Sequence, residues 1–429
     1  MTRRRAYAAI AVVCAVPRLA VLFRERDSIT AAFTEKSDIF AQVFVQHGTF
    51  GLIPGEPSAY TQPLYGWFLI PVYWIFGRSW LSIGLTQILL AIVTALLVYE
   101  IGRRVLGPRA GLAAAAIATL NPYLIWHDVH VNREIVDQVC AAALVLLTLL
   151  VAERRSLRLA ALLGVVTGLS MLGNSRLVFI PLLVAAYLAW RLPRARASAI
   201  VVAVVLAGAA VAVAPWLIRN KVNVGCWTLT TDGRAMWKAN NTQTYNLLSH
   251  GLWIDDVQHI PRQKGENYYT PDDARTYYEK GLPTLAHNLY PNECEQMSFF
   301  EHRTFLFWQR HPGEKAKLMA LSAKLLWQPS VFETSGRNDA GGRLDIGRRI
   351  VEPAYMWALY VLAVIGIFLA PRAFVVLAVL LLGYQTAAAL AFVGATRYRV
   401  AWDFLVVLLA TATLARAAAW MQNRRRAAA

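Results

Sequence analysis

Two acidic residues stand beside apolar stretches, where a carboxylate can do acid–base chemistry at a membrane surface. The first is Asp38, in Ser37-Asp38-Ile39-Phe40, which follows the first apolar stretch of the chain. A carboxylate held at this level can take a proton from an acceptor hydroxyl. The structural alternative is an acid in the first turn of a helix, where it complements the helix dipole. From its position alone, Asp38 fits the structural alternative better than a catalytic role.

The second acidic position, Glu134, lies in a polar stretch that runs from His127 into the start of another apolar block. Ionisable groups at such a boundary are costly to dehydrate, so a functional role is the default interpretation. We therefore expect a functional role for Glu134. His127, Asp128 and His130 offer ligands for a divalent metal ion, although their spacing matches no established metal motif. The alternative to a metal site is a solvated polar turn at the end of a pair of spans.

Several arginines lie next to apolar blocks at positions that membrane orientation does not explain. Guanidinium groups match phosphate oxygens with paired hydrogen bonds, so these residues are candidate phosphate ligands. Contact with lipid headgroups is the alternative. Arg18, inside the first apolar block, is expected instead to extend its charge toward the membrane surface. The candidate phosphate ligands are Arg176, Arg219, Arg397 and Arg399.

The elements that must position these residues are apolar blocks of membrane-spanning length. Hydrophobic residues make up 57% of the 429 residues, and charged residues only 16%. A soluble fold of this composition would expose large apolar patches, whereas about 20 apolar residues cross the hydrocarbon core as a helix. We therefore predict an all-α integral membrane protein with about ten transmembrane helices. The predicted spans are 6–23, 80–101, 110–126, 135–152, 157–172, 177–190, 198–217, 353–370, 373–393 and 401–418.

The distribution of positive charge predicts the orientation of these spans. The formal net charge is +17, and much of the excess lies in short arginine clusters between alternate blocks and at both ends. Such clusters favour the cytoplasmic side, so the charge is a topology signal and implies no nucleic-acid partner. We expect a multi-pass protein of the cytoplasmic (inner) membrane, with both termini in the cytoplasm and the active site outside.

Three parts of the chain follow from this topology. Residues 1–217 form an N-terminal transmembrane module whose first external loop is 24–79, residues 218–350 form an extracytoplasmic segment, and residues 351–429 form the C-terminal helices. The short apolar stretch 63–77 is expected to be interfacial or re-entrant rather than a span. Cys226 and Cys294 both lie in the external segment and are able to pair there; the sequence leaves this open.

Several short stretches, spread in order over nearly the whole chain, carry a family resemblance. They are Ser37-Asp38, Gln62-Pro63-Leu64-Tyr65, Arg133-Glu134, Ala214-Pro215-Trp216-Leu217-Ile218-Arg219-Asn220 and Thr396-Arg397-Tyr398-Arg399. Together they resemble the GT-C superfamily of glycosyltransferases. The specific resemblance is to the group that contains dolichyl-phosphate-mannose protein mannosyltransferases and the lipid A aminoarabinose transferase.

This resemblance implies an inverting transfer of a sugar from a polyprenyl-phosphate donor. Asp38 matches the family's catalytic acid and would be the base, and Glu134 would orient the acceptor or a divalent metal ion. The phosphate would be held by arginines, with Gln62 and Tyr65 also in the substrate site. Aminoarabinose transferases carry a lysine where this chain has Gln62, so the acceptor stays open between an envelope lipid, a glycan and a protein. The arginines with the phosphate role are Arg176, Arg397 and Arg399, to which Arg219 is added as a substrate ligand.

Two other classes of function share parts of this pattern. A transporter or flippase of lipid-linked sugars would place ionisable residues near the middle of the spans, but the centres of these blocks are almost free of charge. A polymerase or ligase that uses a pyrophosphate-linked glycan would share the topology and the external arginines. The chain has no nucleotide-binding glycine motif, so the energy for transfer would come from the activated donor.

Overall fold

The computed structural model describes residues 2–31, 35–192, 195–261, 269–332 and 347–428. Over these ranges the chain is almost entirely helical, with no β-strand beyond one isolated bridge between Ile53 and Glu56. The predicted external segment 218–350 includes residues 262–268 and 333–346, which lie outside the described ranges.

Seven apolar helices in the described ranges are long enough to cross a membrane. This confirms the prediction of an all-α, multi-pass membrane protein. Each of the seven coincides with one of the ten predicted spans. They correspond to α1 (Arg3–Arg24), α4 (Trp80–Val105), α7 (Glu134–Arg154), α10 (Ala195–Asn223), α18 (Glu352–Leu369), α19 (Arg372–Ala391) and α21 (Asp403–Ala428).

The other three predicted spans form shorter helices. Block 110–126 is divided into α5 (Pro108–Thr119) and α6 (Pro122–His127). The division falls at Asn121, whose side chain accepts a hydrogen bond from the Tyr123 amide, just before a proline that fits the first turn of a new helix. Block 157–172 is α8 (Leu157–Gly173), and block 177–190 begins with a 3₁₀ turn at Ser175–Leu177 before α9 (Ile180–Arg191).

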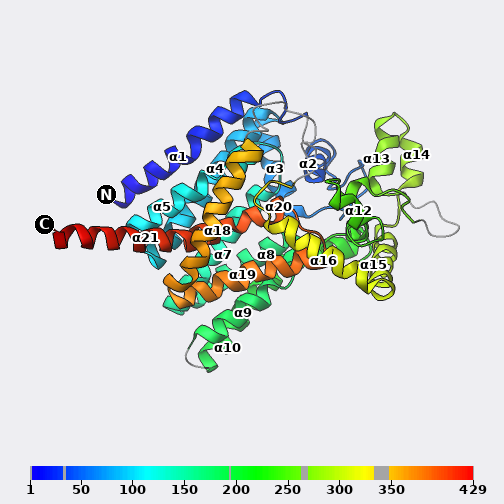
Figure 1. The fold of residues 1–429 in the computed structure, drawn as a ribbon. Coiled ribbons are helices and arrows are strands. Elements are labelled where there is room, and N and C mark those ends of the chain that lie inside the picture. The colour runs from blue at the N-terminus through cyan, green and yellow to red at the C-terminus, as the bar shows by residue number, and fades with distance from the viewer. Residues whose placement is uncertain (1, 32–34, 193–194, 262–268, 333–346, 429) are drawn as a thin grey trace.

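The helical bundle has two different ends. Figure 1 shows both termini at one end, while the helices of the external segment gather at the other. Helices α2 (Lys36–His47) and α3 (Pro63–Phe76) of the first loop lie toward this second end. The external segment contributes α11 (Gly233–Lys238), α12 (Thr244–Ser249), α13 (Pro271–Glu279), α14 (Pro283–Leu289), α15 (Glu293–Arg310) and α16 (Pro312–Trp327).

Helices α8 and α10 cross with their backbones almost in contact. A Cβ atom on Gly164 would lie 2.4 Å from the carbonyl oxygen of Val205, and one on Gly208 would lie 2.8 Å from that of Ala161. Small residues at such crossings replace hydrophobic driving force by close van der Waals packing, as is usual between helices in lipid. The crossing sets the position of the Ser175–Leu177 turn, which directly follows α8.

Arg18 does not extend toward the membrane surface as predicted. Its side chain is 1% exposed, and its Nη2 lies 2.8 Å from Oδ2 of Asp128, which is fully buried. The guanidinium also donates to the Thr119 carbonyl, and Gln138 donates to the other carboxylate oxygen. A buried charge needs a paired and fully hydrogen-bonded environment, and this network supplies it between α1, α6 and α7.

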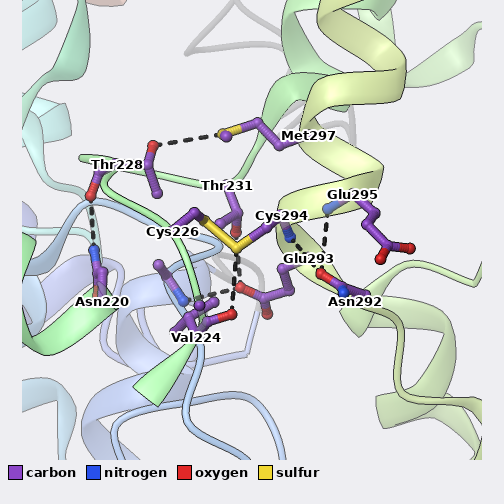
Figure 2. Close-up of a disulfide and its surroundings, with 12 residues drawn as sticks. Asn220, Val224, Cys226, Thr228, Thr231, Asn292, Glu293, Cys294, Glu295 and Met297 are labelled. Carbon is purple, nitrogen blue, oxygen red and sulfur yellow. Dashed lines mark hydrogen bonds between the residues drawn. A yellow bond between two sulfur atoms is a disulfide. The ribbon is translucent and has the colours of Figure 1, made fainter. Parts of the chain in front are cut away.

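A disulfide joins Cys226, just after α10, to Cys294 at the start of α15 (Figure 2). The carboxylate of the neighbouring Glu293 is buried and accepts hydrogen bonds from four groups. These are the hydroxyls of Ser58, Thr231 and Tyr290 and the amide of Ala59. The bonds attach the first external loop to the external segment beside the site described next.

Candidate active site

A cavity of about 1180 Å³ opens between the helical bundle and the external segment. Its wall combines the first external loop, the residues before α7, the Ser175–Leu177 turn, the external segment and α20 (Thr396–Arg399). These parts are far apart in the sequence, so only the fold brings their polar side chains together. The cavity is large enough for a sugar ring and a phosphate group together.

Three guanidinium groups meet at one end of the cavity. They belong to Arg133, Arg176 and Arg397, and Gln62 is also in this wall. Arg133 Nη1 donates to Gln62 Oε1 at 2.5 Å, and Gln62 Nε2 donates to Ser175 Oγ at 3.1 Å. The sequence-predicted residues Arg176, Arg397 and Gln62 therefore lie at one site.

Arg176 carries the least compensated of these charges. Its guanidinium carbon lies 3.5 Å from the ring centre of Tyr398, and Nη1 donates to the carbonyl of Val393. Arg176 forms no ion pair within the described part of the chain. Burial lowers the pKa of Arg176, and the positive charges of Arg133 and Arg397 lower it further. An anion in the cavity would relieve this cost.

Arg397 is shared by two carboxylates. Its Nε donates to Glu134 Oε1 and its Nη2 to Glu35 Oε1, each at 2.7 Å. Glu134 is 2% exposed and its Oε2 lies 3.5 Å from Nε2 of His127, whereas the Glu35 side chain is 20% exposed. Glu134 thus contacts Arg397 from outside the cavity wall, whereas Glu35 and Arg397 both lie in the wall.

Asp38 does not lie with Gln62, Arg176 and Arg397 in the cavity wall. Its side chain is buried and lies outside the cavity wall. Arg78 donates to both carboxylate oxygens, with Nη2 at 2.8 Å from Oδ2 and Nε at 3.0 Å from Oδ1, and the Tyr73 hydroxyl donates to Oδ1 at 2.6 Å. These bonds fasten α2 to α3. The role of Asp38 as a base stays a prediction.

Three other predicted substrate ligands also lie outside the cavity wall. Arg399 is 2% exposed and donates to Asp403 and to two backbone carbonyls. Arg219 donates to the carbonyls of Phe50 and Ser58. The Tyr65 hydroxyl donates to Gln87 at 2.7 Å. Each of these side chains connects parts of the fold, and their roles toward a substrate stay predictions.

The proposed metal ligands do not form a ligand set. Both oxygens of Asp128 accept hydrogen bonds from Arg18 and Gln138, and Nδ1 of His130 lies 2.7 Å from the Trp126 carbonyl. Across the described residues, no group of three or more His, Cys, Asp or Glu side chains is placed to hold a metal ion. The described residues therefore do not fit the divalent ion that the resemblance implied.

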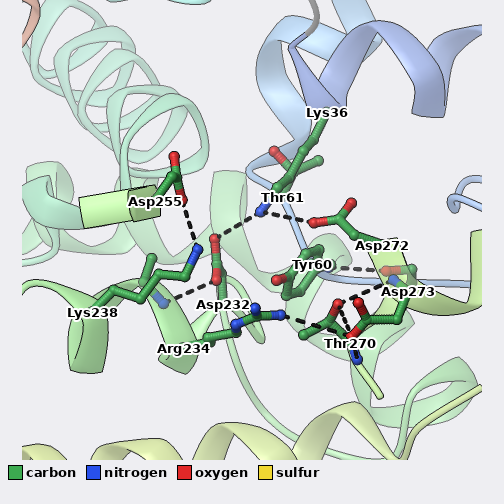
Figure 3. Close-up of polar contacts among 12 residues, drawn as sticks. Lys36, Tyr60, Thr61, Asp232, Arg234, Lys238, Asp255, Thr270, Asp272 and Asp273 are labelled. Atoms are coloured by element: carbon green, nitrogen blue, oxygen red, sulfur yellow. Dashed lines mark hydrogen bonds and ion pairs between the residues drawn. The ribbon is translucent and has the colours of Figure 1, made fainter. Parts of the chain in front are cut away.

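The outer part of the cavity is lined by ion pairs (Figure 3). Lys36 Nζ lies 3.3 Å from Asp232 Oδ2 and 3.7 Å from Asp272 Oδ2. Burial alone would lower the pKa of Lys36, but these carboxylates outweigh it and raise that pKa well above its usual value. Lys238 pairs with Asp255 in the same way at 2.7 Å. The Lys36 pairs connect the first external loop to the external segment, and the Lys238 pair lies within the external segment.

Two of the cavity-wall residues that the sequence did not indicate as candidate ligands are Arg133 and Glu35. Arg133 stood in a stretch that carried the resemblance, but only its neighbour Glu134 was selected. Glu35 lies three residues before Asp38, and its only sequence signal is that it is an acid in the same external loop. The segment from Asp232 to Asp273 contains no motif that distinguishes wall residues from other surface residues.

Comparisons with known proteins agree with this architecture. A family model described as dolichyl-phosphate-mannose-protein mannosyltransferase matches residues 57–218. No curated protein sequence gives a significant match. The oligosaccharyltransferase AglB from Archaeoglobus fulgidus, in complex with an inhibitory peptide and a dolichol-phosphate, superposes with a TM-score of 0.53 at 13% identity. That alignment covers 98% of this chain and 51% of that one.

Two further structures are similar to this chain. The Archaeoglobus fulgidus oligosaccharyltransferase in complex with Zn and sulfate gives a TM-score of 0.52 at 13% identity, covering 97% of this chain and 50% of that one. ArnT from Cupriavidus metallidurans bound to undecaprenyl phosphate gives a TM-score of 0.41 at 13% identity, covering 95% and 78%. This chain spans about half the length of the oligosaccharyltransferase that it matches. The family match and the shared fold confirm the resemblance to GT-C glycosyltransferases.

Proposed function

We propose that this protein is a membrane glycosyltransferase that moves a sugar from a polyprenyl-phosphate donor to an extracytoplasmic acceptor. The observation that carries the proposal is the convergence of Arg133, Arg176 and Arg397 on one cavity, with Arg176 lacking an ion-pair partner among the described residues. A phosphate fits this arrangement because several guanidinium groups can share its oxygens.

The position of the cavity suits a lipid-linked substrate. The reactive bond of a polyprenyl-phosphate sugar lies at headgroup depth, because the polyprenyl chain stays in the hydrocarbon. The cavity lies at the end of the bundle where α7 begins and where the long apolar helices meet the external segment. The exposed Trp74, Ile75 and Phe76 at the end of α3 are suited to the same membrane level.

The chemistry follows from where charge develops. As the bond between the sugar C1 and the phosphate oxygen breaks, negative charge grows on the leaving phosphate. Guanidinium groups already fixed around that position stabilise it with little reorganisation. Inverting transfer requires the acceptor hydroxyl to attack the sugar C1 from the side opposite the leaving phosphate, so the cavity must hold the acceptor and the phosphate on two sides of the sugar.

The similar proteins support the same class of substrate. AglB was solved with a dolichol-phosphate, and the matching family model describes a dolichyl-phosphate-mannose enzyme. The charge distribution supports the cytoplasmic membrane with both termini inside, which puts the cavity outside. The acceptor is an envelope lipid, glycan or protein, and the cavity alone does not select among these.

The direct test is a transfer assay with the purified protein in detergent. Synthetic polyprenyl-phosphate sugars are supplied together with a cell-envelope extract as the source of acceptor, and release of polyprenyl phosphate is followed by mass spectrometry. We expect release that depends on the extract. If only pyrophosphate-linked glycans are consumed, the protein is a polymerase or ligase; if no donor is consumed but labelled donor crosses vesicle membranes, it is a flippase. Either result rejects the proposal.

A further inference from the structure

Two acids of the first external loop, Glu35 and Asp38, differ in their surroundings. Asp38 lies outside the cavity wall, and Arg78 and Tyr73 occupy both of its oxygens. Glu35 lies in the wall, partly exposed, with one oxygen on Arg397. A carboxylate that takes a proton from a substrate must lie within hydrogen-bond distance of the substrate hydroxyl. Of the two, only Glu35 borders the space that a substrate would occupy.

Arg397 links Glu35 to the proposed phosphate position. Its Nη2 contacts Glu35, while its Nε is held by Glu134, which is almost fully buried. The Glu134 contact fixes the guanidinium from behind and is separate from the contact with Glu35. An anion that enters beside Arg133 and Arg176 would therefore compete with Glu35, and not with Glu134, for the exposed edge of Arg397.

Building on the proposed function, we propose that Glu35 is the proton acceptor of the transfer and that the donor phosphate releases it from Arg397. In the empty site the ion pair holds the Glu35 carboxylate in place. When the phosphate takes Nη2 of Arg397, Glu35 becomes a free carboxylate beside the bound sugar. The base is thus active only after the donor has bound, which limits loss of the activated sugar to wrong acceptors.

The step balances in atoms and electrons. The acceptor oxygen forms a bond to C1 of the sugar and gives its proton to a carboxylate oxygen of Glu35. The bond from C1 to the phosphate oxygen breaks, and its electron pair stays on the phosphate, which leaves as polyprenyl phosphate. Arg133, Arg176 and Arg397 hold the added negative charge. Glu35 later returns the proton to water.

The test uses the full-length protein with Glu35→Gln, which keeps the size of the side chain and removes its charge. We expect kcat to fall by about 10²–10⁴-fold, as for other positioned bases. The Kd for polyprenyl phosphate should stay equal or decrease, because a competitor for Arg397 has been removed. Glu56→Gln, in the same loop but outside the cavity wall and paired with His287, is the matched control and should leave both values unchanged.

Three results would overturn the inference. The first is a kcat for Glu35→Gln within about fivefold of the parent value. The second is a Kd of Glu35→Gln for polyprenyl phosphate that rises by as large a factor as kcat falls, because this would show a structural role for Glu35. The third is a larger loss of kcat in Asp38→Asn than in Glu35→Gln while the thermal unfolding of Asp38→Asn matches the parent. If instead the parent protein consumes no polyprenyl-phosphate sugar, the proposed function itself fails.

Discussion

Arg176 is the cavity arginine whose buried charge is least compensated. Its guanidinium lies on the ring of Tyr398 and donates to a carbonyl, but it forms no ion pair within the described ranges. Stacking on an aromatic ring and one neutral hydrogen bond offset only part of the cost of burying a charge. If the three arginines bind phosphate as we propose, we expect Arg176 to contribute most to that binding.

Arg176→Ala should weaken binding of polyprenyl phosphate by about 10–100-fold, the equivalent of one hydrogen bond to a charged group. The measurement is the Kd of the purified protein for polyprenyl phosphate in detergent. Arg424→Ala, near the C-terminus at the other end of the bundle, is the control and should bind like the parent. An unchanged Kd for Arg176→Ala would remove Arg176 from the phosphate site.

Asp128→Asn tests the buried ion pair with Arg18. Removing one charge leaves the other buried without compensation, at a cost of about 3–5 kcal/mol, so we expect a lower Tm in detergent by several degrees. The matched control is Asp27→Asn, because the side chain of Asp27 is 92% exposed. Equal Tm values for the two variants would mean that the pair contributes nothing to stability.

The residue types of the site could be predicted from the sequence, but their partners could not. Asp38 and Arg176 look alike in sequence, as polar groups beside apolar blocks. Asp38 is occupied by Arg78, 40 residues away, whereas Arg176 faces a cavity. Such distinctions depend on contacts between distant segments. Glu35 was overlooked because one acid among several in a loop carries no local signal.

At the scale of elements, an Asn-Pro pair marks one place where the chain departs from a simple span. A hydropathy pattern predicts block 110–126 as one helix, but Asn121 and Pro122 end one helix and begin another. The long spans were predictable because about 20 consecutive apolar residues have few alternatives in lipid. The breaks matter for the site, because α6 ends at His127, in the cavity wall.

The disulfide of Cys226 and Cys294 closes a loop with a sequence separation of 68 residues. Loop-closure entropy predicts about 4 kcal/mol of stabilisation for such a loop. We expect a reductant to lower the Tm of the parent but not that of the double variant Cys226→Ser/Cys294→Ser, which should already be low. Cys14 and Cys140 remain in both proteins and control for other thiol effects. A reductant effect of equal size in both would show that the disulfide is not the cause.

At the scale of the whole molecule, the chain termini and the cavity lie toward opposite ends of the helical bundle. Both termini lie at one end of the bundle, and the cavity lies toward the other, between apolar helices and a polar external segment (Figure 1). The terminal arginine clusters, Arg3–Arg5 and Arg424–Arg426, lie at the first end, and the arginines of the cavity wall lie at the second. In our proposal, arginine therefore sets membrane orientation at one end and binds phosphate at the other.

The most direct test of the central proposal is the rate of polyprenyl phosphate release from a polyprenyl-phosphate sugar, measured by mass spectrometry for the parent and for Arg133→Ala/Arg176→Ala. We predict extract-dependent release by the parent and a loss of at least about 10²-fold in the double variant, with Arg424→Ala unchanged and all three proteins alike in thermal unfolding. Equal rates of release in the parent and the double variant would show that the transfer, if it occurs, takes place outside this cavity.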